Sequence, residues 1–287
     1  MTPDGRLPII FDTDIGSDID DAYALAFILS CHELRLEAVT VVSGDVDERG
    51  RIAAKMLHLA GRDEVPVALG VGSDKDVNQA RWAEGFGYAP DPRSAAELIA
   101  EMVATHPGEI TLVPVGPMSN IAAALELRPE LAEEVAEIVI MGGGVYTGYR
   151  GDLQPVPEYN IRTDVPAAQA LFGCGASIRM AGLEATAALQ FDRFLQERLA
   201  ASGLPLPQAM RELLEVWPSR TPTLFDPMAV AMVIEPEICD YQPLCIEVTD
   251  EGLTVTGEGE PNVRLGVRPR VHRFFDLYMT RLLSGAA

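Results

Sequence analysis

Apolar and polar positions alternate in two different ways along this chain. Short, continuous apolar runs are typical of buried parallel strands, and they predict strands at Leu7–Phe11, Leu36–Val42, Ile110–Val115, Ile138–Met141 and Ser177–Ala181. Between them, apolar residues recur every three or four positions, which predicts helices at Asp20–Ser30, Asp47–Leu59, Ser94–Thr105, Ser119–Leu127, Val165–Phe172, Asp192–Ala201, Gln208–Val216 and Pro227–Ile234. This order predicts the α/β class, with a mostly parallel, Rossmann-like sheet flanked by helices.

The pattern changes near the end of the chain. Short antiparallel strands are predicted there, followed by a helix at Val271–Leu283; the strands are Cys245–Val248, Thr254–Thr256 and Val263–Val267. No Ser/Gly-rich linker and no internal repeat divides the sequence. We therefore predict one domain over residues 1–287, with a small C-terminal antiparallel section. Val71–Pro92 and Val145–Pro157 lack periodicity and are predicted to be loops of the length that binding loops often have.

Composition and net charge limit the classes of molecule that the protein is expected to bind. The 287 residues carry a formal net charge of −21, which argues against binding to nucleic-acid backbones or anionic membranes but not against a small nucleoside. The first residues show no secretory signal, and no apolar run is long enough to cross a membrane. The four cysteines form no CxxC pair, so they are expected to be structural thiols. These features predict a cytoplasmic protein.

Five aspartates lie within ten residues at the first strand–helix junction: Asp12, Asp14, Asp18, Asp20 and Asp21. In an open α/β sheet this junction is at the carboxyl end of a strand, where ligands bind. Helix capping accounts for Asp20 and Asp21 but not for the other three. Because so many like charges repel, the cluster favours a hard divalent cation with oxygen ligands, Ca²⁺ or Mg²⁺.

Four further segments stand where strand ends are expected. Asp45 ends TVVSGD, prolines break the strand in ITLVPVGPMSN, glycines follow Met141 in MGGG with EYN further on, and Asp226 lies in FDPMAV. Each has a plain structural alternative, since Asp45 and Asp226 can cap helices and MGGG can form a tight turn. No Lys-Ser/Thr follows the glycines, so they are not a phosphate loop.

Taken together and in this order, these segments resemble the inosine–uridine nucleoside hydrolase family from about Leu7 to about Ile234. The family's DTDPGxDDA corresponds to DTDIGSDIDDA, a variant with two inserted residues that include Asp18. Its LVxTGPLTNIA corresponds to LVPVGPMSNIA, and its MGG, AEFN and DPxAV segments correspond to MGGG, PEYN and DPMAV. The resemblance implies the nucleoside hydrolase fold and a homodimer or homotetramer.

The resemblance also implies a Ca²⁺ ion at the bottom of a ribose pocket. The implied metal ligands are the side chains of Asp14, Asp21 and Asp226 and the backbone carbonyl of Val115. The implied ribose contacts are Asp20, Met141, Glu158 and Asn160, with Asp12 supporting the ligands from behind and Asp18 without a counterpart. In the implied reaction, metal-bound water attacks the anomeric carbon, Asp14 is the general base, and base and ribose are released.

Three departures from the family concern the substrate. Asp45 and Asp152 stand where asparagines usually contact the sugar, and Phe225 stands where a histidine usually helps the base to leave. Trp217 and Arg220 either contact the base or pack a helix end. If the two acids lie in the pocket, the substrate has a cationic or donor-rich sugar or base; if they are protonated or bound by neighbouring donors, ordinary ribonucleosides react.

Two other functions compete with nucleoside hydrolysis. A haloacid dehalogenase-type phosphatase also places D-x-D after its first strand, and it would use Asp12 as nucleophile with Mg²⁺. That pattern does not explain GPMSN, MGGG or DPMAV, and it has Thr or Val where Gly16 stands. The second alternative is an inactive homologue that binds nucleosides or metal without turnover. The retained set of Asp14, Asp21 and Asp226 argues against it.

Overall fold

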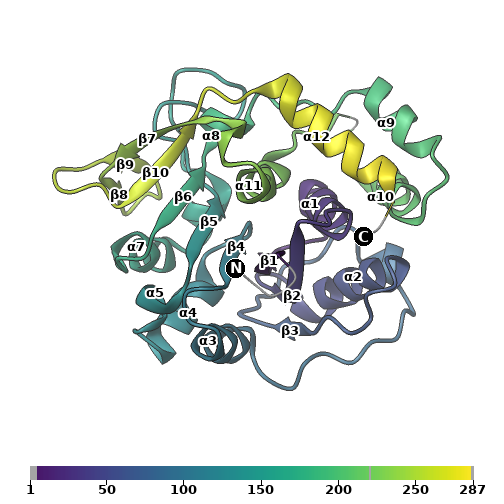
Figure 1. Ribbon diagram of the computed structural model, residues 1–287, viewed down its shortest axis with the longest axis horizontal. Coiled ribbons are helices and arrows are strands. Elements are labelled where there is room, and N and C mark those ends of the chain that lie inside the picture. The colour runs from purple at the N-terminus through teal and green to yellow at the C-terminus, as the bar shows by residue number, and fades with distance from the viewer. Residues whose placement is uncertain (1–4, 220, 286–287) are drawn as a thin grey trace.

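A computed structural model describes residues 5–219 and 221–285 of the chain (Figure 1). Its centre is an eight-stranded sheet with the strand order β3-β2-β1-β4-β5-β6-β10-β7. These strands are β1 (Leu7–Thr13), β2 (Leu34–Val41), β3 (Val67–Leu69), β4 (Thr111–Pro114), β5 (Glu137–Met141), β6 (Ile178–Ala181), β7 (Asp240–Leu244) and β10 (Val263–Val267). Neighbouring strands from β3 to β10 run parallel, which confirms the predicted α/β class.

The C-terminal strands only partly match the prediction. β8 (Ile246–Val248) and β9 (Thr254–Thr256) form the expected small antiparallel sheet. Val263–Val267 was predicted to belong to that antiparallel section, but β10 joins the main sheet, parallel to β6 and antiparallel to the edge strand β7. The antiparallel pairing was right for one neighbour, β7, but the place of the strand outside the main sheet was wrong, because the apolar pattern of a strand does not define which strands lie beside it.

Helices cover both faces of the main sheet (Figure 1). The predicted ones are α1 (Asp20–Leu29), α2 (Val46–Leu59), α3 (Ala95–Thr105), α4 (Ser119–Leu127), α7 (Val165–Gly173), α9 (Arg193–Ala200), α10 (Pro205–Val216), α11 (Phe225–Ile234) and α12 (Val271–Ser284). Short elements that were not predicted are α5 (Leu131–Glu134), α6 (Tyr159–Thr163), α8 (Leu183–Thr186) and the 3₁₀ helices Ala80–Ala83 and Pro236–Ile238. No helix in the described ranges is long and apolar enough to cross a membrane.

The sheet separates two apolar layers. Ile9 and Phe11 point to the layer that includes α1, α2, α10, α11 and α12, whereas Ile10 points to the layer that includes α3, α4 and α7. Every residue of α1 is buried, and α11 is buried from Asp226 to Val233. These two helices pack against each other (Figure 1), and α1 begins seven residues after the end of β1.

Candidate active site

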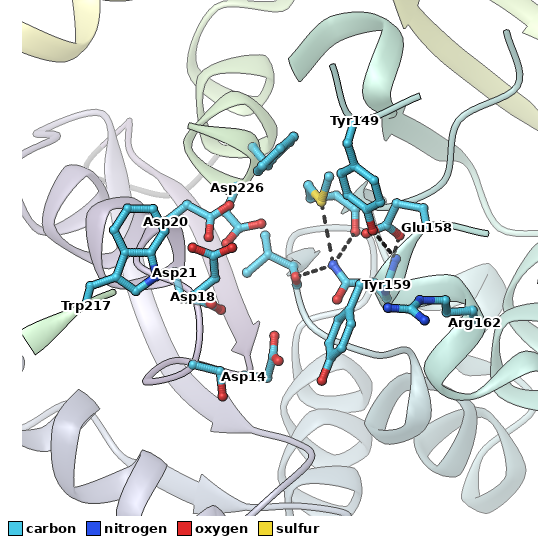
Figure 2. Close-up of a pocket in the computed structure, with 15 residues that line it drawn as sticks. Asp14, Asp18, Asp20, Asp21, Tyr149, Glu158, Tyr159, Arg162, Trp217 and Asp226 are labelled. Atoms are coloured by element: carbon cyan, nitrogen blue, oxygen red, sulfur yellow. Dashed lines mark hydrogen bonds between the residues drawn. The ribbon is translucent and has the colours of Figure 1, made fainter. Parts of the chain in front are cut away.

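A cavity of about 380 Å³ opens at the carboxyl ends of β1, β4 and β5 (Figure 2). One group of residues in its wall is acidic and comes from the β1–α1 junction and from α11: Asp14, Asp18, Asp20, Asp21 and Asp226. The other described residues of the wall are Ser17, Val115, Met141, Tyr149, Glu158, Tyr159, Asn160, Arg162, Trp217 and Phe225. The cavity therefore contains most of the side chains that the sequence motifs single out.

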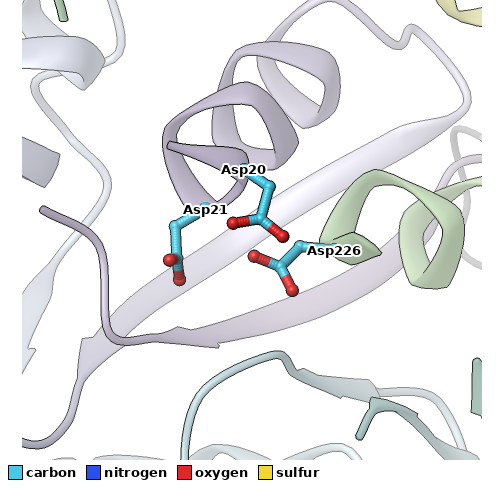
Figure 3. Close-up of side chains that lie close together, drawn as sticks. All are labelled: Asp20, Asp21 and Asp226. Atoms are coloured by element: carbon cyan, nitrogen blue, oxygen red, sulfur yellow. The ribbon is translucent and has the colours of Figure 1, made fainter. Parts of the chain in front are cut away.

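Three carboxylates converge at the two helix starts (Figure 3). Asp20 and Asp21 lie in the first turn of α1, and Asp226 lies in the first turn of α11 rather than at its N-cap. One oxygen atom from each lies within 4.8 Å of the others, and all three side chains are buried. The positive ends of two helix dipoles favour negative charge at this point.

The protein alone opposes ionisation of this trio. Burial raises the pKa values of Asp20, Asp21 and Asp226 well above the usual range, and the neighbouring carboxylates raise them further. A cation bound between the oxygen atoms would favour the ionised forms. Since all the donors are carboxylate oxygens, the trio fits a hard divalent cation such as Ca²⁺.

Asp14 lies in the same cavity but outside the trio. Burial raises its pKa to about 6, and the guanidinium group of Arg49 opposes that rise. Arg49 Nη2 lies 3.9 Å from Asp14 Oδ2. The structure thus brings Asp21 and Asp226 together as the resemblance implies, but the third carboxylate of the trio is Asp20, which had been expected to contact ribose.

Asp12 lies behind the cavity and does not line it. Its Oδ1 accepts hydrogen bonds from Thr40 Oγ1 at 2.5 Å and from Asn120 Nδ2 at 2.7 Å. Burial raises its pKa to about 7, although these two bonds oppose the rise. This position suits a residue that holds the end of β1 in place from behind.

On the cavity wall opposite the acidic trio, hydrogen bonds join the LVPVGPMSN, MGGG and EYN segments. Asn160 Nδ2 donates to the carbonyl of Val115 at 2.6 Å and to that of Met141 at 3.1 Å. Glu158 Oε2 accepts from the amides of Gly143 at 2.9 Å and of Asn160 at 3.0 Å. Burial raises the pKa of Glu158, and these amide donors oppose the rise. The carbonyl of Val115, predicted to bind the metal, and the predicted sugar contacts Glu158 and Asn160 therefore belong to one hydrogen-bond network.

Aromatic residues occupy the mouth of the cavity. Trp217 lies on the side of the acidic trio, and Tyr149, Tyr159 and Arg162 lie on the side of Glu158 (Figure 2). The ring of Phe225 meets that of Tyr149 edge-on at 6.0 Å, and Tyr149 Oη accepts a hydrogen bond from the amide of Tyr159 at 2.7 Å. Two of the three predicted base contacts, Trp217 and Phe225, thus line the cavity. Arg220 lies outside the described residues.

Two predicted sugar contacts lie elsewhere. Asp45 is exposed, and its side chain caps α2 by accepting from the amides of Asp47 and Glu48, both at 3.1 Å. Asp152 is also exposed, and neither acid lines the cavity. We therefore correct both assignments. Because neither acid lies in the pocket, these two positions do not favour an unusual, donor-rich substrate.

Several residues of the site were not found from the sequence. Asn120 is part of the GPMSN segment and Tyr159 is part of EYN, so both motifs contained a signal that was not assigned a role. No motif singled out Arg49, because the residues around it in the sequence match the polar first turn of a predicted helix. Its side chain is only 1% exposed and contacts the β1–α1 loop.

The family model described as inosine-uridine preferring nucleoside hydrolase matches residues 9–276. The chain belongs to this family. It is accordingly an N-glycosyl hydrolase of the ribonucleoside hydrolase type, and the phosphatase alternative is discarded.

Relatives of this nucleoside hydrolase cover nearly its whole length. The pyrimidine-specific ribonucleoside hydrolase RihA of Citrobacter koseri is 31% identical, with 96% of this chain and 98% of that protein aligned. Among solved structures, the plant nucleoside hydrolase PpNRh1 has a TM-score of 0.88 at 26% identity, covering 97% and 99% of the two chains. The purine-preferring ribonucleoside hydrolase from Gardnerella vaginalis has a TM-score of 0.81 at 27% identity, covering 96% and 98%.

Proposed function

We propose that this enzyme hydrolyses the N-glycosidic bond of a ribonucleoside and requires a Ca²⁺ ion for it. The observation that carries the proposal is the convergence of Asp20, Asp21 and Asp226 on one point of the cavity. Asp21 and Asp226 of this trio are proposed as ligands, together with Asp14 and the carbonyl of Val115, which line the same cavity, and Asp20 beside them is proposed to contact ribose. When bound, the ion lowers the pKa of a water molecule and binds sugar hydroxyls.

The chain's own groups supply the remaining chemistry. With a pKa of about 6, Asp14 is mostly ionised at neutral pH and can accept a proton from the attacking water. The carboxylates around the cavity stabilise the positive charge that develops on the sugar as the bond to the base lengthens. Glu158 and Asn160 are held by backbone groups, so they are ordered to receive sugar hydroxyls. Asp20 also lines the cavity.

The aromatic mouth of the cavity is proposed to hold the base. Trp217 and Phe225 offer flat apolar surfaces, on which a purine or a pyrimidine can stack. The two groups of relatives have different preferences, because the RihA relatives are named pyrimidine-specific and the Gardnerella vaginalis enzyme is named purine-preferring. We therefore propose an ordinary ribonucleoside as substrate without assigning the base.

A nucleoside panel tests this proposal. Purified protein is incubated with uridine, cytidine, inosine and adenosine in the presence of Ca²⁺, and the free base is quantified by chromatography. We expect release of base and ribose from at least one of the four. Nucleoside binding without release of any base would contradict the proposal and support the inactive homologue.

A further inference from the structure

A buried arginine underlies the loop that contains the two inserted residues. Arg49 comes from α2, where its side chain is only 1% exposed. It lies near the start of that helix, where the dipole disfavours a cation. A buried guanidinium group is costly unless its donors are all satisfied. Helix stability alone therefore does not explain this residue.

All three guanidinium nitrogens of Arg49 have acceptors. Nε donates to the carbonyl of Ser43 at 2.6 Å, and Nη1 donates to the carbonyls of Asp14 and, at 2.8 Å, of Ile15. Nη2 donates to Ser17 Oγ at 2.9 Å and lies 3.9 Å from Asp14 Oδ2. Three of these partners are consecutive or nearly consecutive residues of the β1–α1 loop.

Gln79 holds the same loop from the other side. The backbone amide of Gln79 donates to the carbonyl of Gly16 at 2.9 Å, and its side-chain Nε2 donates to the carbonyl of Asp18 at 2.9 Å. Gly16 has a φ of +107°, and a Cβ atom there would lie 2.5 Å from Val77 Cγ1. Contacts from Arg49 and Gln79 thus add to the loop's own hydrogen bonds, such as that from the amide of Ile19 to Asp18 Oδ1 at 2.7 Å.

We propose that Arg49 is a positioning residue that fixes the Asp14 carboxylate for cation binding and proton transfer. The inference rests on the proposed function of the site. This positioning role requires the planar, forked shape of the guanidinium group and not only its charge. One group must reach the carbonyls of Asp14 and Ile15 and the hydroxyl of Ser17 at the same time. The ammonium group of a lysine retains the charge but cannot bridge these acceptors.

The substitution Arg49→Lys tests the inference. Residues that orient metal ligands usually contribute 10- to 100-fold to metal affinity or activity. We expect Arg49→Lys to weaken Ca²⁺ binding, measured by titration calorimetry at 25 °C, by about 10-fold or more, and to lower kcat by a similar factor. The matched control is Arg51→Lys on the same helix, where Arg51 pairs with Asp47 at 3.5 Å; it should leave both values unchanged.

The outcomes separate this inference from the proposed function. If the wild-type protein neither binds Ca²⁺ nor releases a base, the proposed function fails. If the wild-type protein does both and Arg49→Lys retains its Ca²⁺ affinity and kcat, even with a lower melting temperature, Arg49 is only structural and the inference fails. Should Arg49→Lys not fold, Ser17→Ala removes a single acceptor of Arg49. It should weaken Ca²⁺ binding several-fold, and an unchanged affinity would overturn the inference.

Discussion

Asp14 combines the properties that a general base needs in this pocket. It lines the cavity, and its pKa of about 6 leaves it mostly ionised at neutral pH without making it a very weak base. Burial and the charge of Arg49 act in opposite directions on that pKa. Arg49 therefore favours the ionised form of Asp14 that both proton transfer and cation binding need.

The substitution Asp14→Asn should lower kcat by about 10²- to 10⁴-fold, because an amide cannot accept the proton from water. Steady-state kinetics on the best nucleoside of the panel measures the change. Asp45→Asn is the matched control, since Asp45 lies outside the cavity and Asn caps helices as well as Asp does. Wild-type kcat in Asp14→Asn would exclude Asp14 as the base.

Sequence motifs located the acidic residues even where no strand directly precedes them, as for Asp226 in the first turn of α11. Asp12, Asp14, Asp226 and Glu158 were all singled out in this way, and the structure gathers three of them at the cavity with Asp12 behind it. Arg49 could not be found, because its contact with Asp14 spans 35 residues and depends on how α2 docks. A polar residue in a helical pattern gives no indication that it is buried.

At the scale of elements, the tight turn before α1 sets where the acids of that helix begin. Gly16 adopts a φ of +107°, and Val77 and Ile52 pack where a side chain would project. The turn therefore needs both the backbone freedom of glycine and its lack of a Cβ atom. Because Asp20 and Asp21 follow four and five residues later, a shift of the turn would move their carboxylates.

The substitution Gly16→Ala should destabilise the protein by roughly 1–3 kcal/mol, since it adds strain at positive φ to a clash. Chemical denaturation measures the free energy of unfolding. Gly85→Ala is the control, because Gly85 also has a positive φ, of +75°, but a Cβ atom there meets nothing within 4 Å. Equal losses in the two variants would show that the contacts with Val77 and Ile52 contribute nothing.

The element pattern was more predictable than the strand pairing. Continuous apolar stretches gave α1 and α11, both of which are 10 residues long and buried on nearly all sides. The edge strand β7 was missed because DYQPL contains a proline and is mostly exposed, which is typical of edge strands but not of a recognisable apolar run. Without β7, nothing in the sequence indicated that β10 is placed between two strands of the main sheet.

At the scale of the whole molecule, buried acids link stability to pH. Burial raises the pKa values of Asp12 and Asp14 to about 7 and about 6, above the value of about 3.9 for an unfolded aspartate. At pH values between the unfolded and the folded pKa values, the folded state binds more protons than the unfolded state. The free energy of unfolding contributed by these groups therefore falls as the pH rises from about 4 to about 7.

In the presence of a chelator, the melting temperature should fall from pH 5 to pH 8, on the order of 5 °C. Acids paired with arginines, such as Asp91 beside Arg93, have lowered pKa values and titrate below this window. Added Ca²⁺ should reduce the fall, because it binds the ionised carboxylates. Differential scanning calorimetry measures both curves. A melting temperature that rises with pH in the chelator would show that these acids do not carry raised pKa values.

The dependence of nucleoside hydrolysis on a divalent cation distinguishes a metal-assisted reaction from one that the protein performs alone. Protein stripped with a chelator, dialysed and assayed for base release should be inactive and should recover activity on addition of Ca²⁺. Asp226→Asn, which removes one carboxylate of the trio, should remain inactive at the Ca²⁺ concentration that restores the wild-type protein. Full base release by the stripped wild-type protein, or full activity of Asp226→Asn, would contradict a catalytic cation at this site.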